Sequence, residues 1–443
     1  MDGTEQATIF GISETAFVIF YFAVILGGSC LAAFYNRRGP FMLLFGLTLV
    51  SIVLGIVGGV GGLRTIAVAA VLLAFAAMLS YGFREFLINV VGVFSNELAK
   101  ELRTAPLTAG FGMFIIFIYA VAAIFAPAIA PYGEAEVISS AFAPADENML
   151  LGADQLGRDM FSRVIYGARN TVSLALVGTT LAFILGALAG LLAAVRGGWF
   201  DQAMGRTADV IMSIPSLIFG LLMVSIFGSL ATNPAWLRMF SGNVGQADYF
   251  LGVALMCFFG FLVGLLVLAT VAETFLGWII TSLISGGVIL VFALGLATVF
   301  NSSEIILILV VSVIYSPRVY RLTRAVAGNV VVMDYIEAAR LRGERRWYLI
   351  RREILPNSTA PLVAEFGLEF CFVFLLISGL SFLGLGIQPP TADWGSMVKE
   401  NATLISFGEI TPLIPAAAIA LLTVAVNFVV DWMLFRSSGL KEN

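Results

Sequence analysis

The sequence predicts an all-α polytopic membrane protein with about eleven transmembrane helices, its N-terminus outside and its C-terminus inside. Of its 443 residues, 60% are hydrophobic and only 12% are charged, and the mean hydropathy is +1.00. Apolar runs of about 20 residues recur along the chain, and each can cross the ~30 Å hydrocarbon core of a bilayer as a helix. Because lipid offers the backbone no hydrogen-bond partner, a helix is the structure expected for each run.

Composition also excludes the usual kinds of catalytic and metal site. The chain has no histidine, and Cys30, Cys257 and Cys371 all lie inside apolar runs, so we expect neither a metal site nor a disulfide framework. No lysine follows a glycine-rich phosphate-binding loop, which predicts that the chain has no ATPase site of its own. We therefore expect no catalytic residue or cofactor in this chain, and contacts with lipid and other proteins rather than with nucleic acid.

An N-terminal block over residues 1–104 contains three apolar runs, at about 14–35, 41–60 and 64–83. The N-terminus lacks the basic start of a secretory signal peptide, so we expect the first run to be retained. The basic stretch after it and the polar stretch after the third run suit the inside. We interpret the block as an accessory unit that faces lipid or binds a partner; the alternative is that it lines a path through the membrane.

Residues 105–230 are expected to contain three further spans, at about 107–130, 171–194 and 208–230. The loop at 131–168 carries six acids and two arginines, a balance that suits the outside of the cell.

Two more apolar runs, at about 249–271 and 277–300, form a predicted transmembrane hairpin within residues 231–302. The hairpin adds two crossings and so preserves the orientation of everything after it. Residues 303–443 then hold the last three spans, at about 303–317, 359–382 and 410–434.

The segment from Arg318 to Arg352 holds nine of the chain's arginines and no lysine, which predicts that it lies inside the cell. Within it, Asp334 to Arg342 is expected to form a short helix, because Ala338 and Ala339 favour helix and Gly343 can supply the terminating turn. At ~1.5 Å per residue this helix spans roughly 13 Å, too short to cross a bilayer and well sized for a groove on another protein.

Around this helix the residue spacing resembles a known family. Glu337-Ala338-Ala339 is followed after three residues by Gly343, and after ten more by Ile354-Leu355-Pro356. This spacing resembles the cytoplasmic loop of ABC importer permeases, most of all the second, C-type permease of the dipeptide/oligopeptide/nickel group. Two stretches predicted to lie outside, 151–174 and 381–397, are similar to the same group.

The resemblance covers about 105–230 and 303–436, and it implies a type I ABC importer-like permease core in the bacterial inner (plasma) membrane. It also implies a heterodimer with a second permease, two ATP-binding subunits that hold ATP and Mg, and a periplasmic solute-binding protein. The short helix would transmit closure of the ATPase subunits to the membrane. The coupling residues implied are Glu337, Ala338, Ala339, Arg340, Arg342 and Gly343. The other arginines of this loop are expected to contact lipid headgroups, with Arg340 and Arg342 as the candidates for pairing with acids of the ATPase.

Four residues are candidates for the translocation path. The stretch 206–217, which contains Asp209 and Pro215, resembles the family pattern, and we interpret it as a bent, path-lining helix. The alternative is a helix-start acid and a simple kink. Glu365 and Glu369 lie one turn apart within a single span, where acids are costly in lipid. They either form a polar wall that attracts an amino group or cation, or make structural contacts to a neighbouring helix or subunit.

Arg158, Asp159, Arg163 and Trp394 are candidates for a periplasmic gate or a receptor contact. For the three charged residues we favour pairing with local acids over contact with a docked receptor. Trp394 is expected to anchor at the membrane interface.

The sequence thus indicates a permease subunit of an ATP-driven importer for peptides or a related small solute. The rival interpretation is a self-sufficient secondary transporter or channel that uses Glu365 and Glu369. A membrane enzyme is disfavoured because no catalytic set is found. The solute is left open among peptides, nickel, opines and oligosaccharides.

Overall fold

The computed structural model describes residues 8–9, 12–13, 75–232, 302–407 and 411–437. The chain divides into two compact units, Met1–Leu107 and Thr108–Asn443, which are described separately. The predicted spans at 14–35 and 41–60 and the predicted hairpin runs at 249–271 and 277–300 lie outside the described residues.

In the first unit, β1 (Thr8–Ile9) pairs antiparallel with β2 (Ile12–Ser13). A helix over Phe75–Phe94 is long and apolar enough to cross a membrane, and α3 (Asn96–Arg103) follows it. The sequence predicts a span at 64–83 that ends before the polar stretch beginning at Arg84. In the structure the helix instead continues through Arg84 for ten more residues, to Phe94. Arg84 can be accommodated because its Nη1 donates a hydrogen bond to the Ala105 carbonyl at 2.9 Å.

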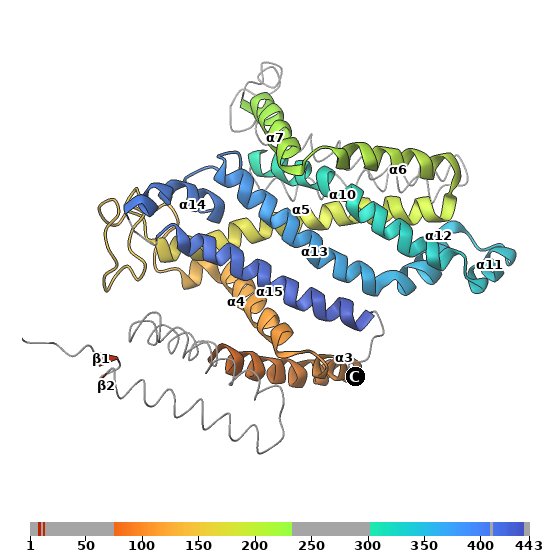
Figure 1. Ribbon diagram of the computed structural model, residues 1–443, viewed down its shortest axis with the longest axis horizontal. Coiled ribbons are helices and arrows are strands. Elements are labelled where there is room, and N and C mark those ends of the chain that lie inside the picture. The colour runs from red at the N-terminus through yellow and green to blue at the C-terminus, as the bar shows by residue number, and fades with distance from the viewer. Residues whose placement is uncertain (1–7, 10–11, 14–74, 233–301, 408–410, 438–443) are drawn as a thin grey trace, which may run out of the picture. The chain divides into compact units, whose positions relative to one another are not determined.

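The second unit is a bundle of long helices (Figure 1). In chain order the elements are α4 (Leu107–Ile129), α5 (Met160–Arg196), α6 (Gly198–Ser213), α7 (Ser216–Thr232), α10 (Ser302–Val331), α11 (Asp334–Leu341), α12 (Arg346–Tyr348), the π-helical segment η1 (Leu349–Ile354), α13 (Leu355–Phe382), α14 (Trp394–Asn401), the 3₁₀ segment η2 (Ala402–Phe407) and α15 (Leu413–Ser437).

Helix α10 lies at the centre of this bundle, packed against α5, α6, α7 and α13. Of its most apolar 18-residue stretch, 72% is buried, against 17–50% for the other described spans of the unit, so it faces mainly protein. Its contact with α5 runs along small residues one turn apart, Gly178, Ala182, Gly186 and Gly190. A Cβ added to Gly186 would lie 2.6 Å from the Cβ of Val319, so glycine permits this close helix contact.

Three predicted helix boundaries within the second unit are wrong. The span predicted from residue 171 begins at Met160, because the carboxylate of Asp159 caps the helix by accepting a hydrogen bond from the Ser162 N–H at 2.8 Å. The span predicted to end at residue 317 runs to Val331. Pro317 cannot bond to the Val313 carbonyl, and the Ser316 hydroxyl donates to that carbonyl at 3.4 Å instead. The span predicted at 359–382 is helical from Arg346 onwards.

The predicted third span of the core, 208–230, is two helices rather than one kinked helix. Helices α6 and α7 meet at 91°, and residues 198–207, expected in a loop, belong to α6. Ile214 has an extended backbone at the break, as the residue before a proline prefers, so Pro215 marks a full change of direction.

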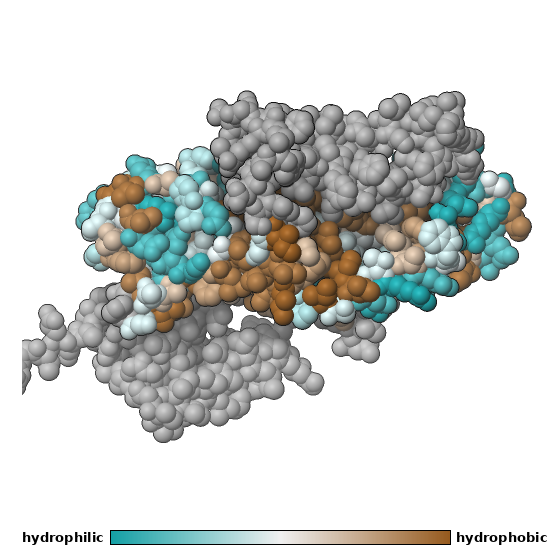
Figure 2. All heavy atoms as spheres, turned by 90° about the horizontal axis from the view of Figure 1, so that it is seen from above, coloured by the Kyte–Doolittle hydropathy of each residue, from teal (hydrophilic) through white to brown (hydrophobic). Residues whose placement is uncertain are grey.

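The two ends of the second unit are polar and the middle is apolar. The segment 131–159 and α14 lie at one end of the bundle, and α11 and α12 lie at the opposite end (Figure 1). Figure 2 shows an apolar band between the polar ends on the face that is visible. Among the described residues of the whole chain, six helices are long and apolar enough to span a membrane, or seven if α6 and α7 form one broken span. The total of eleven stays a prediction.

Candidate functional site

Helix α11 is formed by local signals. Asp334 and Glu337 stand in its first turn, where their charges suit the positive end of the helix dipole. Gly343 has φ of +82°, and two hydrogen bonds close the last turn: its N–H to the Arg340 carbonyl at 2.9 Å, and the Glu344 N–H to the Ala339 carbonyl at 3.2 Å. The predicted short helix is therefore confirmed, and it ends at a glycine as expected.

The inner face of α11 is packed onto the ends of longer helices. Ile336 and Ala339 are fully buried. They share a hydrophobic cluster with Leu191, Leu192, Ala327, Leu349, Ile350 and Ile354, which belong to α5, α10 and η1. Because this base joins helices that continue into the bundle, α11 is tied to three of them at once.

The outer face of α11 is open to solvent in the described chain. Of the predicted coupling residues, Glu337, Ala338, Arg340, Arg342 and Gly343 are exposed, whereas Ala339 belongs to the buried base. Leu341 is 83% exposed and Val332 79% exposed on the same segment, an unusual exposure for such large apolar side chains. The end of the bundle thus carries a surface of mixed apolar and charged side chains on a packed support.

Helix α10 carries three arginines at intervals of three residues, each paired with an acid from another helix. Arg318 Nε lies 3.5 Å from Glu369 Oε1 on α13. Two further pairs join α10 to α6: Arg321 with Asp209 at 3.6 Å, and Arg324 with Asp201. The sequence alone places these arginines in a basic loop after Pro317 and does not single out Asp201, whereas α10 continues to Val331.

The predicted path residues therefore lie in different environments. Glu369 is buried and Glu365, one turn away, is half-buried. Asp209 is exposed, and Pro215 lies at the break between α6 and α7. The two glutamates of α13 do not form an open acidic wall, because Arg318 pairs with Glu369 and is the more exposed partner.

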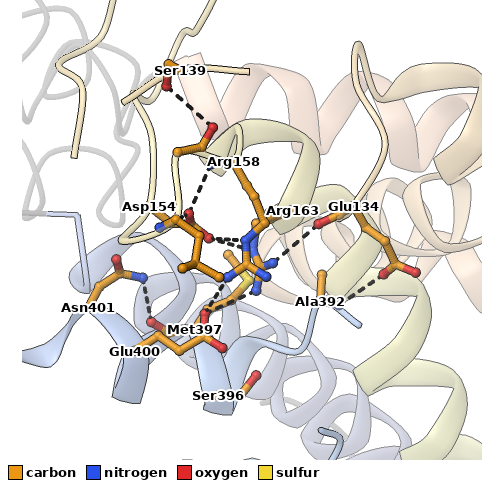
Figure 3. A network of polar contacts seen from close by, with 12 residues as sticks. Glu134, Ser139, Asp154, Arg158, Arg163, Ala392, Ser396, Met397, Glu400 and Asn401 are labelled. Atoms are coloured by element: carbon orange, nitrogen blue, oxygen red, sulfur yellow. Dashed lines mark hydrogen bonds and ion pairs between the residues drawn. The ribbon is translucent and has the colours of Figure 1, made fainter. Parts of the chain in front are cut away.

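At the opposite end of the unit, Arg158 and Arg163 belong to a buried ion-pair network (Figure 3). Arg158 lies 2.7 Å from Asp154 and 3.0 Å from Glu400. Arg163 lies 3.3 Å from each of the same two acids. The network joins the segment before α5, the first turn of α5 and the end of α14. In this arrangement neither guanidinium group is available to an approaching receptor.

Trp394 is fully buried, so its side chain is not exposed as that of an interfacial anchor would be. Its indole Nε1 donates a hydrogen bond to the Val164 carbonyl at 2.9 Å, and its ring meets Tyr119 edge-on with centroids 5.3 Å apart. Asp393, which precedes it, caps α14 and accepts a hydrogen bond from the Thr171 hydroxyl at 2.8 Å. Burial raises the pKa of the Asp393 carboxyl. These hydrogen bonds hold Trp394 in contact with α5.

Among the described residues, no group of three or more His, Cys, Asp and Glu side chains is arranged to hold a metal ion.

Comparison with known proteins places the chain in a family. The family model described as binding-protein-dependent transport system inner membrane component matches residues 182–437. The chain belongs to this family. It is therefore a multi-pass membrane protein and a permease subunit of an ABC importer, a class that works with ATPase and solute-binding partners. This membership favours the importer over a self-sufficient secondary transporter.

Several permeases share similarity over most of the chain. The chain is 25% identical over 338 residues to the dipeptide transport system permease protein DppC of Alkalihalophilus pseudofirmus, covering 76% of this chain and 86% of that one. It is also 25% identical over 336 residues to the probable D,D-dipeptide transport system permease protein DdpC of Escherichia coli, covering 76% and 88%. A glutathione transport system permease protein, GsiD of Pectobacterium atrosepticum, is 26% identical over 284 residues, covering 63% and 69%.

Replacing Glu400 by glutamine should destabilise the end of the bundle that holds this network, because among the described residues Asp154 would then be the one acid within ion-pair distance of Arg158 and Arg163. Breaking a buried ion pair typically costs about 3–5 kcal/mol. We expect a clearly lower thermal unfolding temperature of the detergent-purified importer. Lys399→Gln, at an exposed neighbouring residue, is the matched control and should change stability by less than about 0.5 kcal/mol. Equal unfolding temperatures for the two variants would contradict the structural role of the network.

Replacing Ile336 by alanine should loosen α11 from its base, because the buried side chain fills the cluster beneath the helix. A loss of about 2–4 kcal/mol in local stability is expected, measured as faster hydrogen exchange of the α11 amides in the purified permease. Leu341→Ala, on the exposed face of the same helix, should leave exchange in the isolated permease unchanged. Faster exchange in both variants would show that the two faces are not distinct.

Proposed function

We propose that this chain is one of two permease subunits of a heterodimeric ABC importer that carries peptides across the bacterial inner membrane. The relatives named for dipeptides, D,D-dipeptides and glutathione support a peptide-like solute. The proposed coupling to an ATPase rests on the structure of α11, a short helix whose inner face is packed and whose outer face is exposed. We assign that outer face to an ATP-binding subunit.

The remaining partners follow from this assignment. Two ATP-binding subunits bind ATP and Mg, a second related permease completes the pathway, and a periplasmic solute-binding protein delivers the solute. This chain supplies no ATPase site. The proposed topology keeps eleven membrane helices, with the N-terminus outside and the C-terminus inside. Its support within the second unit is that the segment 131–159 and α11 lie at opposite ends of the bundle (Figure 1).

In the proposed mechanism, α11 acts as a lever. Closure of the ATPase subunits displaces α11, and its base of Ile336 and Ala339 passes the movement to α5, α10 and η1. Helix α10 packs against α6, α7 and α13, so the path-lining helices move with it. A shift of this kind requires α11 to bind one state of the ATPase more tightly than the other.

We also propose roles for the residues outside the lever. Asp209, Pro215, Glu365 and Glu369 belong to the translocation path, with Pro215 setting its bend. Residues 1–104 form an accessory block and residues 231–302 an inserted hairpin, while 105–230 and 303–443 form the core.

Purification of the tagged chain from its native membrane tests the assembly. We expect a second permease and two kinds or copies of ATP-binding subunit to co-purify, and the reconstituted complex to import alanyl-alanine only with ATP and the solute-binding protein. Proton-driven uptake by this chain alone would contradict the proposal.

Replacing Gly343 by valine should abolish transport without preventing membrane insertion. The position has φ of +82°, where a β-branched residue is strained by roughly 1–2 kcal/mol, although a Cβ there would meet no atom within 4 Å. The strain alters the ending of α11 and hence its presentation to the ATPase. The measurements are membrane content of the chain and ATP-driven uptake.

Gly328→Val is the matched control for this substitution. A Cβ at Gly328 also meets no atom within 4 Å, but its backbone is helical, so uptake should persist. Wild-type uptake by the Gly343 variant would count against a coupling role for α11.

A further inference from the structure

Arg318 lies near the middle of α10, a helix long and apolar enough to span a membrane, and its side chain is nevertheless open on one side. It stands about 24 Å from the start of α10 at ~1.5 Å per residue, within the length of a bilayer core. Its side chain is 41% exposed in the described chain. A charged side chain at such depth must face protein or water rather than lipid. The open side of Arg318 therefore marks a face of α10 and α13 that lipid does not cover.

The guanidinium group is held in place from behind. Its central carbon lies 4.6 Å from the centroid of the Phe372 ring and 5.3 Å from that of Tyr315. The Tyr315 hydroxyl donates a hydrogen bond to the Phe372 backbone carbonyl at 3.1 Å, which ties Tyr315 on α10 to α13. Arg318 is thus a positioned cation rather than a freely moving one.

Arg318 is the exposed member of its ion pair and Glu369 the buried one, with the half-buried Glu365 one helical turn from Glu369. Glu369 is 1% exposed in its side chain, and its contact with Arg318 is through Nε at 3.5 Å. Within the described ranges, no carboxylate or carbonyl accepts a hydrogen bond from the terminal nitrogens of Arg318. By contrast, Arg324 donates from Nη2 to Asp201 at 2.6 Å and is engaged twice by that carboxylate. Of Arg318 and Arg324, only Arg318 has terminal guanidinium nitrogens that donate to no acceptor among the described residues.

We propose that Arg318 binds the carboxylate of the solute as it passes through the permease, an inference that rests on the proposed peptide-import function. A planar guanidinium matches a carboxylate with two parallel hydrogen bonds, and every linear peptide carries such a group at its C-terminus. The site reverses the expectation that the acids of α13 attract an amino group: Glu369 sits behind the arginine and orients it, and the group met by the solute is the cation.

The test uses the complete importer, with its solute-binding protein, reconstituted in liposomes and supplied with alanyl-alanine. Three double variants are compared. R318Q/E369Q removes both charges and avoids leaving a buried acid unpaired. R318E/E369R keeps the pair but presents the negative member outward. R324Q/D201N neutralises another α10 ion pair and is the control.

We expect the control to import within about twofold of wild type and the neutral pair to import about tenfold more slowly, the size of one lost charged hydrogen-bond contact. The reversed pair should be slower still, because it opposes carboxylate with carboxylate. All variants should retain the second permease and the ATPase subunits on purification.

Four results would overturn the inference while leaving peptide import intact: a neutral pair within twofold of wild type, a reversed pair equal to or faster than the neutral pair, an equal loss in the control, or loss of the second permease from the neutral pair. The last would mean that Arg318 contacts the partner subunit instead. If wild-type importer takes up no alanyl-alanine, the proposed substrate class fails, and the carboxylate site fails with it. Should the reversed pair not assemble, the neutral and control pairs decide the matter.

Discussion

The close contact between α5 and α10 is the constraint on which the rest of the second unit depends. Two helices can approach this closely only where one of them lacks side chains, and Gly178, Gly186 and Gly190 provide that on α5. Once α10 lies against α5, its other faces receive α6, α7 and α13. The far ends of α5 and α10 also form part of the support beneath α11, so the placement of the coupling surface is a consequence of packing deep in the bundle.

At two sites in this unit, buried charged side chains are stabilised by oppositely charged side chains nearby. At one end, two arginines and two acids neutralise one another where water is excluded. In the middle, a buried acid lies behind a partly exposed arginine. A charge that would be expelled from an apolar environment can remain there because its counter-charge is fixed by a neighbouring helix. The difference between the two sites is that the second leaves donors unused.

Local sequence signals were sufficient for some elements and insufficient for others. The start and end of α11 could be predicted because its caps lie within a few residues of it, and most spans could be predicted from the length of their apolar runs. The continuation of α10 beyond Pro317 could not, since it depends on the Ser316 hydroxyl satisfying a freed carbonyl. The burial of Trp394 and the pairing of Arg318 with Glu369 were also missed, because each requires knowledge of which distant helix lies opposite.

The ion-pair network of Arg158, Arg163, Asp154 and Glu400 has a consequence for how the chain is made. Arg158 and its partner Glu400 are separated by 242 positions in the sequence. At ~5–20 residues per second, a ribosome needs roughly 10–50 s to travel that distance. During this interval Arg158 and Arg163 have emerged without Glu400, the acid that pairs with both of them. This end of the bundle can therefore close only after synthesis has passed α14, which makes the completion of this region one of the last events in biogenesis.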